Sequence, residues 1–196
     1  MAQKYRYISG DSHLEIDSKH WIGRVPAKYR DQAPRLVRQP DGSDAWLIGE
    51  DIKRPAAAAD LYGGKGRDAY VPFEGRYEGT PGTGGPEQRV REQDHDGIDA
   101  EVLFPSQQGG PKFWRRIEDD NAYKAIVRAY NSWLTEEYCA TNPDRLIGVG
   151  ILPLACELDN VIDELEYFPS SDFIARSSGL PVPSTALCCG RPQTRW

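Results

Sequence analysis

The amino-acid sequence predicts an α/β fold in which strands and helices follow one another along the chain. Two features of the 196 residues support this prediction. Short apolar runs of the length of strands alternate with longer segments whose apolar residues have helical spacing. The run at 146–153 is apolar nearly throughout, which is typical of a parallel strand that is covered on both faces. We therefore expect successive strand–helix units around a parallel sheet.

The first strand is expected at 5–16, because YRYISG alternates and is rich in residues that favour strands. The two short apolar runs between Pro34 and Glu50 flank Pro40-Asp41-Gly42, which predicts a hairpin outside the main sheet. The stretch between Tyr62 and Pro86 is rich in glycine and shows no sustained period, so we expect a long loop there. Residues 34–86 together form a predicted excursion from the main fold.

A short helix is predicted to begin near Pro86, because proline suits a first helical turn, and to end at Gly97, a favourable C-terminal cap. A second strand is expected at 98–105. The longest helix should begin after a cap at Asp119 or Asp120, because the apolar residues that follow keep helical spacing until an Asn-Pro pair.

The third strand, at 146–153, precedes a last helix whose apolar residues recur at i, i+3, i+4 and i+7. These residues are Leu158, Val161, Ile162 and Leu165. We expect the face that they form to pack on the sheet. From Pro169 onward Ser, Pro, Arg and Cys dominate without any period. We therefore divide the chain into a domain at 1–166 and an irregular tail at 167–196.

Composition excludes several classes of protein. With 39% hydrophobic and 10% aromatic residues the chain is unlike a disordered protein. Its net charge of −6 argues against a nucleic-acid partner, which needs a basic surface. No apolar run approaches the about 20 residues that span a bilayer, and residues 1–10 lack a secretory signal, so we expect a cytoplasmic protein without a membrane partner. The four cysteines match no disulfide or zinc spacing and are expected to be free thiols.

Three potential metal ligands lie in the motif Asp11-Ser12-His13-Leu14-Glu15, at the end of the first predicted strand. Because side chains alternate along a strand, Asp11, His13 and Glu15 are predicted to point to one face. An imidazole beside carboxylates suits zinc or a similar divalent ion. The alternative is that both carboxylates are solvated and that His13 merely forms a hydrogen bond with one of them. Short motifs of this kind also occur by accident.

Five blocks between about Tyr5 and Leu165 carry a resemblance to a known family. In order they read DSHLEI, RVPAKYRDQAPRLV, DGSDAWL, DHDGIDAEVLFPS and NPDRLIGVGILPL. Together they resemble the amidohydrolase-related (amidohydrolase 2) family that includes aminocarboxymuconate-semialdehyde decarboxylase. The resemblance implies a (β/α)8 TIM barrel with one divalent metal ion, usually zinc, and no organic cofactor. It places two metal ligands on Asp11 and His13, with Glu15 on the same face as a possible third.

The chain departs from this family in its later part. The family also takes a histidine from a middle strand and an aspartate from the last strand, whereas the three histidines here are His13, His20 and His95. The 196 residues are also fewer than the about 250 of a typical barrel. We therefore expect the N-terminal portion of an incomplete barrel of the metal-dependent hydrolase type.

Three functions follow from these observations. The first is a metal-dependent hydrolase that acts on a small organic substrate through a metal-activated water. The chain would be a truncated form of this enzyme, either active or inactive. The second is a non-oxidative decarboxylase of an aromatic or unsaturated acid, because the same family supports both reactions. The third is a non-catalytic fragment, whose unpaired strand edges would favour association with other copies as a homo-oligomer.

Other polar residues are weaker candidates. His20 and His95 are expected at the surface. Ser106, directly after the second strand, either donates a hydrogen bond to a substrate carboxylate or forms an ordinary turn. Trp114, with the arginines that follow it, either supplies an aromatic wall with anion contacts or begins a solvated helix.

Overall fold

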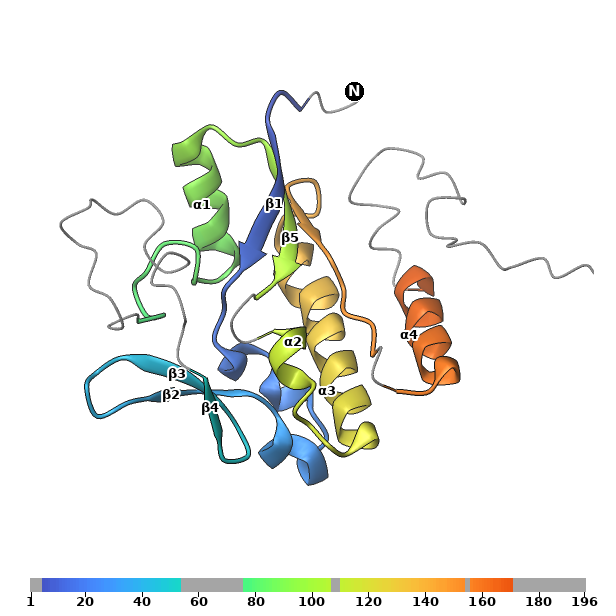
Figure 1. Ribbon diagram of the computed structural model, residues 1–196. Coiled ribbons are helices and arrows are strands. Elements are labelled where there is room, and N and C mark those ends of the chain that lie inside the picture. Colours follow the sequence, from blue (N-terminus) through green and yellow to red (C-terminus); the bar gives the residue numbers. More distant parts are fainter. Residues whose placement is uncertain (1–4, 54–75, 107–109, 154–155, 171–196) are drawn as a thin grey trace, which may run out of the picture.

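The structure is a computed structural model that describes residues 5–53, 76–106, 110–153 and 156–170. The described residues form a mixed α/β fold with one parallel and one antiparallel sheet (Figure 1). The parallel sheet has the order β1-β5-β6, and its strands are β1 (Ile8–Leu14), β5 (Ala100–Pro105) and β6 (Leu146–Gly148). The antiparallel sheet consists of β2 (Arg35–Arg38), β3 (Asp44–Ile48) and β4 (Asp51–Lys53).

The three predicted strands of the parallel sheet are confirmed, and β5 lies between the other two. β1 is irregular: Ser9 pairs with Glu101 and Ser12 with Leu103, so β1 has one residue more than β5 between these pairs. The regular register then continues with His13 opposite Phe104. β6 covers only the first residues of the predicted 146–153 strand.

The predicted hairpin is also confirmed. Gly42 has a φ of 84°, in the left-handed region that glycine adopts without strain, and the Asp41 carboxylate accepts hydrogen bonds from the backbone and the hydroxyl of Ser43. β4 was not predicted, because a three-residue strand is too short to show a period. Residues 54–75, which contain most of the predicted glycine-rich loop, lie outside the described residues.

The two helices predicted before β5 and before β6 are confirmed. α1 (Pro86–Asp96) is followed by its C-terminal cap, Gly97, which has a φ of 70°. α3 (Asp120–Trp133) is capped by Asp119, whose carboxylate accepts from the backbone N–H groups of Asn121 and Ala122. The helical path continues beyond α3 as a π-helix, η6 (Leu134–Tyr138), and a 3-10 turn, η7 (Cys139–Thr141).

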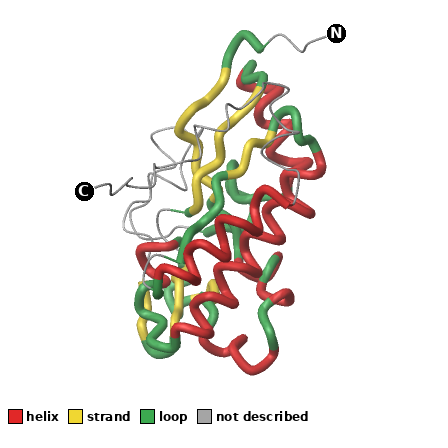
Figure 2. Tube along the Cα trace, turned by 90° about the vertical axis from the view of Figure 1, so that its right-hand side faces the viewer, coloured by secondary structure: helices red, strands yellow, loops and turns green. Residues whose placement is uncertain are grey.

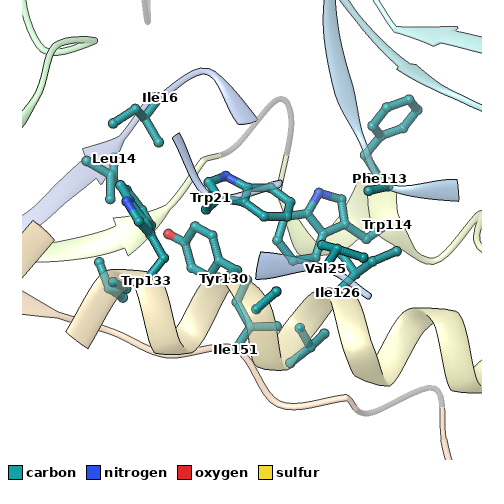
Figure 3. Packing of buried hydrophobic residues seen from close by; sticks show 14 of the residues in the cluster. Leu14, Ile16, Trp21, Val25, Phe113, Trp114, Ile126, Tyr130, Trp133 and Ile151 are labelled. Carbon is teal, nitrogen blue, oxygen red and sulfur yellow. The ribbon is translucent and has the colours of Figure 1, made fainter. Parts of the chain in front are cut away.

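Short helical segments complete the described fold. They are the 3-10 turns η1 (Ser18–His20), η2 (Ile22–Arg24) and η3 (Ala27–Gln32), and the four-residue α2 (Pro111–Trp114). These segments and α3 bury an aromatic cluster in which Trp21, Trp114, Tyr130 and Trp133 lie together (Figure 3). Their ring centroids are 5.3 to 5.8 Å apart along the chain of contacts, within the range of favourable aromatic pairs.

The last helix, α4 (Leu158–Ser170), forms where a helix was predicted but packs differently. It lies beside α3 (Figure 2). Its polar face makes the contacts, because Glu164 accepts from Arg128 at 2.6 Å and from Asn131 at 2.7 Å. Leu158, Ile162 and Leu165 are 71%, 41% and 40% exposed. The expectation that these three residues pack on the sheet is therefore wrong, because the opposite, hydrogen-bonding face meets the polar side chains of α3.

This orientation of α4 makes a prediction for stability. Replacing Ile162 with alanine is expected to change the free energy of unfolding by less than about 0.5 kcal/mol, because this residue is 41% exposed in the folded chain. The same substitution at Ile126, which is fully buried in α3, should cost about 2–5 kcal/mol. Urea denaturation of both variants measures the difference. Equal losses would contradict the orientation described here.

α4 runs across the predicted boundary at residues 166 and 167, and the remainder of the predicted tail lies outside the described residues. Cys139 and Cys156 are free thiols, as predicted, and burial raises the pKa of Cys139 to about 12. Cys188 and Cys189 are outside the described residues. Within the described ranges, no helix is both long enough and apolar enough to cross a membrane.

Candidate metal centre

Asp11 and His13 lie together at the C-terminal half of β1. The Nε2 atom of His13 is 3.6 Å from a carboxylate oxygen of Asp11, as the shared strand face predicts. The Asp11 side chain is 88% exposed and the His13 side chain 28%, so the pair is open to solvent on the Asp11 side. The His13 ring contacts the ring of its register partner Phe104, with centroids 6.0 Å apart.

The orientation of the His13 ring follows from its second nitrogen. Nδ1 lies 3.2 Å from the backbone carbonyl oxygen of Pro105, at the end of β5. A carbonyl can only accept, so Nδ1 donates this hydrogen bond and Nε2 is the nitrogen that faces Asp11. Metal-binding histidines usually donate their other ring N–H in this way, which fixes the tautomer and the direction of the ligating nitrogen.

Glu15, the third predicted ligand, is held by other partners. It follows the last residue of β1, is only 3% exposed, and accepts hydrogen bonds from the Tyr77 hydroxyl at 3.0 Å and the Ser106 hydroxyl at 2.7 Å. The indole N–H of Trp46 donates to the same Tyr77 oxygen at 2.8 Å. A chain of hydrogen bonds thus joins the antiparallel sheet, through Tyr77 and Glu15, to the segment that follows β5.

The two groups that the structure brings together fit part of a zinc site. Zinc ligand atoms lie about 2.0–2.2 Å from the ion, so two of them at a tetrahedral angle are about 3.4 Å apart. The separation of 3.6 Å between Asp11 and His13 is close to this value. Among the described residues, no three His, Cys, Asp or Glu side chains are arranged to hold a metal ion. The described part of the chain therefore offers two ligands, fewer than the three that catalytic zinc sites usually take from the protein.

A cleft of about 620 Å³ adjoins this pair. His13 and Glu15 lie on one wall of the cleft, and residues of α1, among them Arg89 and Gln93, lie on another. This volume is within the range of about 300–1,000 Å³ that small-molecule sites occupy.

A buried ion pair supports the wall that α1 forms. Arg89 Nε donates to a carboxylate oxygen of Glu101 at 2.6 Å, and each side chain is only 11% exposed. Gln93 and Ser12 donate to the same carboxylate at 2.8 and 3.0 Å. Burial alone raises the pKa of Glu101, but the hydrogen bond and charge of Arg89, with the bonds from Gln93 and Ser12, hold it below its ordinary value of 4.5. Glu101 is therefore ionised at neutral pH.

Sequence reasoning missed Glu101 and the Tyr77 hydroxyl. Glu101 carries a usable signal, because it is a charged residue between Ala100 and Val102 in a strand that is otherwise apolar. Tyr77 carries none, since it follows a glycine-rich stretch and its partners Glu15 and Trp46 are remote in sequence.

The weaker candidates fall in different places. His20 ends η1 and is exposed, and His95 is exposed near the end of α1, where it lines the cleft. Ser106 donates its proton to Glu15, so the predicted donation to a substrate carboxylate is not the arrangement found. Trp114 is buried in the aromatic cluster rather than exposed as a wall, and Arg116 pairs with Asp51 at 2.7 Å.

Two solved structures resemble this fold. An amidohydrolase from Mycobacterium avium subsp. paratuberculosis K-10 is 20% identical with a TM-score of 0.57, and the match covers 87% of this chain and 48% of that one. The IDCase of Metarhizium anisopliae in its apo form is 16% identical with a TM-score of 0.53, and the match covers 91% and 45%. The chain thus spans about half the length of each protein. No family model and no curated protein matches the sequence.

Proposed function

We propose that the chain contributes Asp11 and His13 as metal ligands to a metal-dependent hydrolase of the amidohydrolase type that acts on small organic substrates. In this proposal the described strands and helices correspond to the first strand–helix units of a (β/α)8 TIM barrel. The parallel order β1-β5-β6 and the likeness in fold to an amidohydrolase support it. The observation that carries it is the His13 ring, oriented by the Pro105 carbonyl so that Nε2 faces the Asp11 carboxylate.

The roles of the individual residues follow from their contacts. Asp11 and His13 would hold a divalent ion, with zinc the best match to an imidazole and a carboxylate. Such an ion, when bound, lowers the pKa of water to about 7 and supplies hydroxide at neutral pH. The Pro105 carbonyl keeps the Nδ1 proton in place, and Phe104 limits rotation of the ring. Glu15 lies outside the pair, and we assign it to hold the hydroxyls of Ser106 and Tyr77.

Metal binding tests the ligand assignment. The wild-type chain is expected to bind about one Zn²⁺, and His13→Ala and Asp11→Asn should each weaken binding by more than the 10- to 100-fold that loss of an outer hydrogen-bond partner costs. Isothermal titration calorimetry measures both affinities. His20→Ala is the matched control, because this histidine is exposed on η1 away from the pair, and it should bind as the wild type does. Unchanged affinity in His13→Ala would overturn the assignment.

A second measurement tests the reaction. Hydrolysis of small amides and lactones is expected to disappear on treatment with a chelator, to return on addition of Zn²⁺, and to be absent in His13→Ala. Release of CO2 from aromatic acids with the same metal dependence would instead favour the decarboxylase. If the chain binds Zn²⁺ but catalyses neither reaction, the metal site would be supported and the hydrolase activity contradicted.

A further inference from the structure

The Tyr130 hydroxyl lies in the aromatic core without a hydrogen-bond partner among the described residues. Its oxygen is buried. Three indole rings surround the phenol, with centroids 5.5 to 5.8 Å away. In Figure 3 the hydroxyl points away from α3 towards the side on which Leu14 and Ile16 lie, at the end of β1. Buried hydroxyls in proteins nearly always bond to a protein group or to an ordered water.

A small enclosed cavity lies next to this hydroxyl. Tyr130 lines it together with Leu14, Ile16, Trp21, Ser106 and Trp114. The space open to the centre of a water molecule is about 10 Å³, which is about the room that one water needs. A cavity with apolar walls alone stays dry, whereas one with two or more polar groups can hold a water.

The cavity offers the polar groups that a water requires. Burial raises the pKa of Tyr130 above its ordinary value of 10.0, so the phenol keeps its proton and acts as a donor. Ser106, which also lines the cavity, donates its own proton to Glu15. A serine hydroxyl has two lone pairs beside this proton and accepts hydrogen bonds through them.

We propose that one buried water molecule occupies this cavity, accepts a hydrogen bond from Tyr130 and donates one to Ser106. The bridge extends the chain that runs from Trp46 through Tyr77 and Glu15 to Ser106, and joins it to the middle of α3. Ser106, which follows β5 beside the candidate metal centre, is then held from two sides. The inference is independent of the proposed hydrolase activity, because it rests on the core alone.

The water bridge can be tested by whether Tyr130→Phe lowers or raises the stability of the fold. If the water is present, Tyr130→Phe removes a hydrogen bond, and the equilibrium constant for unfolding should rise about fivefold. If the hydroxyl is unpaired, the same substitution removes a costly buried group and the constant should fall. Urea denaturation of the full chain measures the change. A fall, or no change, would overturn the proposal.

A double-mutant cycle locates the other end of the bridge. Ser106→Ala should by itself raise the unfolding constant, because Glu15 loses a hydrogen bond. With Tyr130→Phe added, the combined effect should be smaller than the product of the two single effects, since one water serves both groups. Electron density in a high-resolution crystal structure should show one water about 2.7–3.2 Å from the Tyr130 oxygen. Independent effects, or an empty cavity in that density, would contradict the bridge.

Discussion

Replacing Arg89 with methionine is expected to lower the free energy of unfolding by about 3–5 kcal/mol. The reason is that the substitution leaves the Glu101 carboxylate buried without its cation, which costs more than the intact pair contributes. Arg24→Met is the matched control, because Arg24 pairs with Glu136 and Glu137 at the surface, where such pairs contribute about 0–1 kcal/mol. Urea denaturation at neutral pH compares the two variants. Equal losses would show that the Arg89 pair behaves as a surface pair.

The Arg89 substitution should also change the dependence of stability on pH. The pKa of Glu101 is lower in the folded chain than its ordinary value of 4.5, so its ionisation stabilises the fold above that pH. This contribution is lost as the pH falls through the folded pKa, because the carboxyl group is then protonated in both states. The difference in stability between wild type and Arg89→Met should therefore be largest near neutral pH and shrink below about pH 4.5. A difference that stays constant would rule out Glu101 as its source.

Replacing Trp21 with alanine is expected to cost about 3–5 kcal/mol of stability. Removal of the buried indole loses the free energy of its burial and also leaves a cavity. Trp21 contacts Trp114 and, in an edge-to-face arrangement, Tyr130, so the aromatic cluster loses a central member. Circular dichroism during urea denaturation measures the loss without relying on tryptophan fluorescence. Tyr7→Ala removes an aromatic ring that is 64% exposed and should change stability by less than about 0.5 kcal/mol. A similar cost for both would contradict the core position of Trp21.

The order of strands and helices could be predicted because the signals for it are local. Pro86 and Gly97 mark the two ends of α1 within a few residues, and Asp119 caps α3 through its own neighbours. The orientation of α4 could not be predicted. An apolar stripe identifies a face of a helix but not its partner, and the hydrogen bond that turns α4 joins Glu164 to Asn131, which lies on another helix.

The candidate site shows the same difference between local signals and contacts with remote segments. Period-two spacing within one strand predicts that Asp11 and His13 lie together, and their side chains are 3.6 Å apart. Glu15 follows the same spacing, but β1 ends before it, so the alternation no longer determines its direction. Its carboxylate is instead positioned by Tyr77 and Ser106, which come from segments remote in the sequence. Spacing alone therefore predicted the pair and not the hydrogen-bonded chain beside it.

The extra residue of β1 between Ser9 and Ser12 sets the phase of the strand. Relative to the side chains of β5, the side chains of β1 before this residue alternate between the two faces of the sheet in one phase. Those after it alternate in the opposite phase. His13 reaches the level of Phe104 only because of this shift. Deleting a single residue there would reverse the facing of the side chains in either the first or the last part of the strand, and with it the alignment of His13 with Phe104.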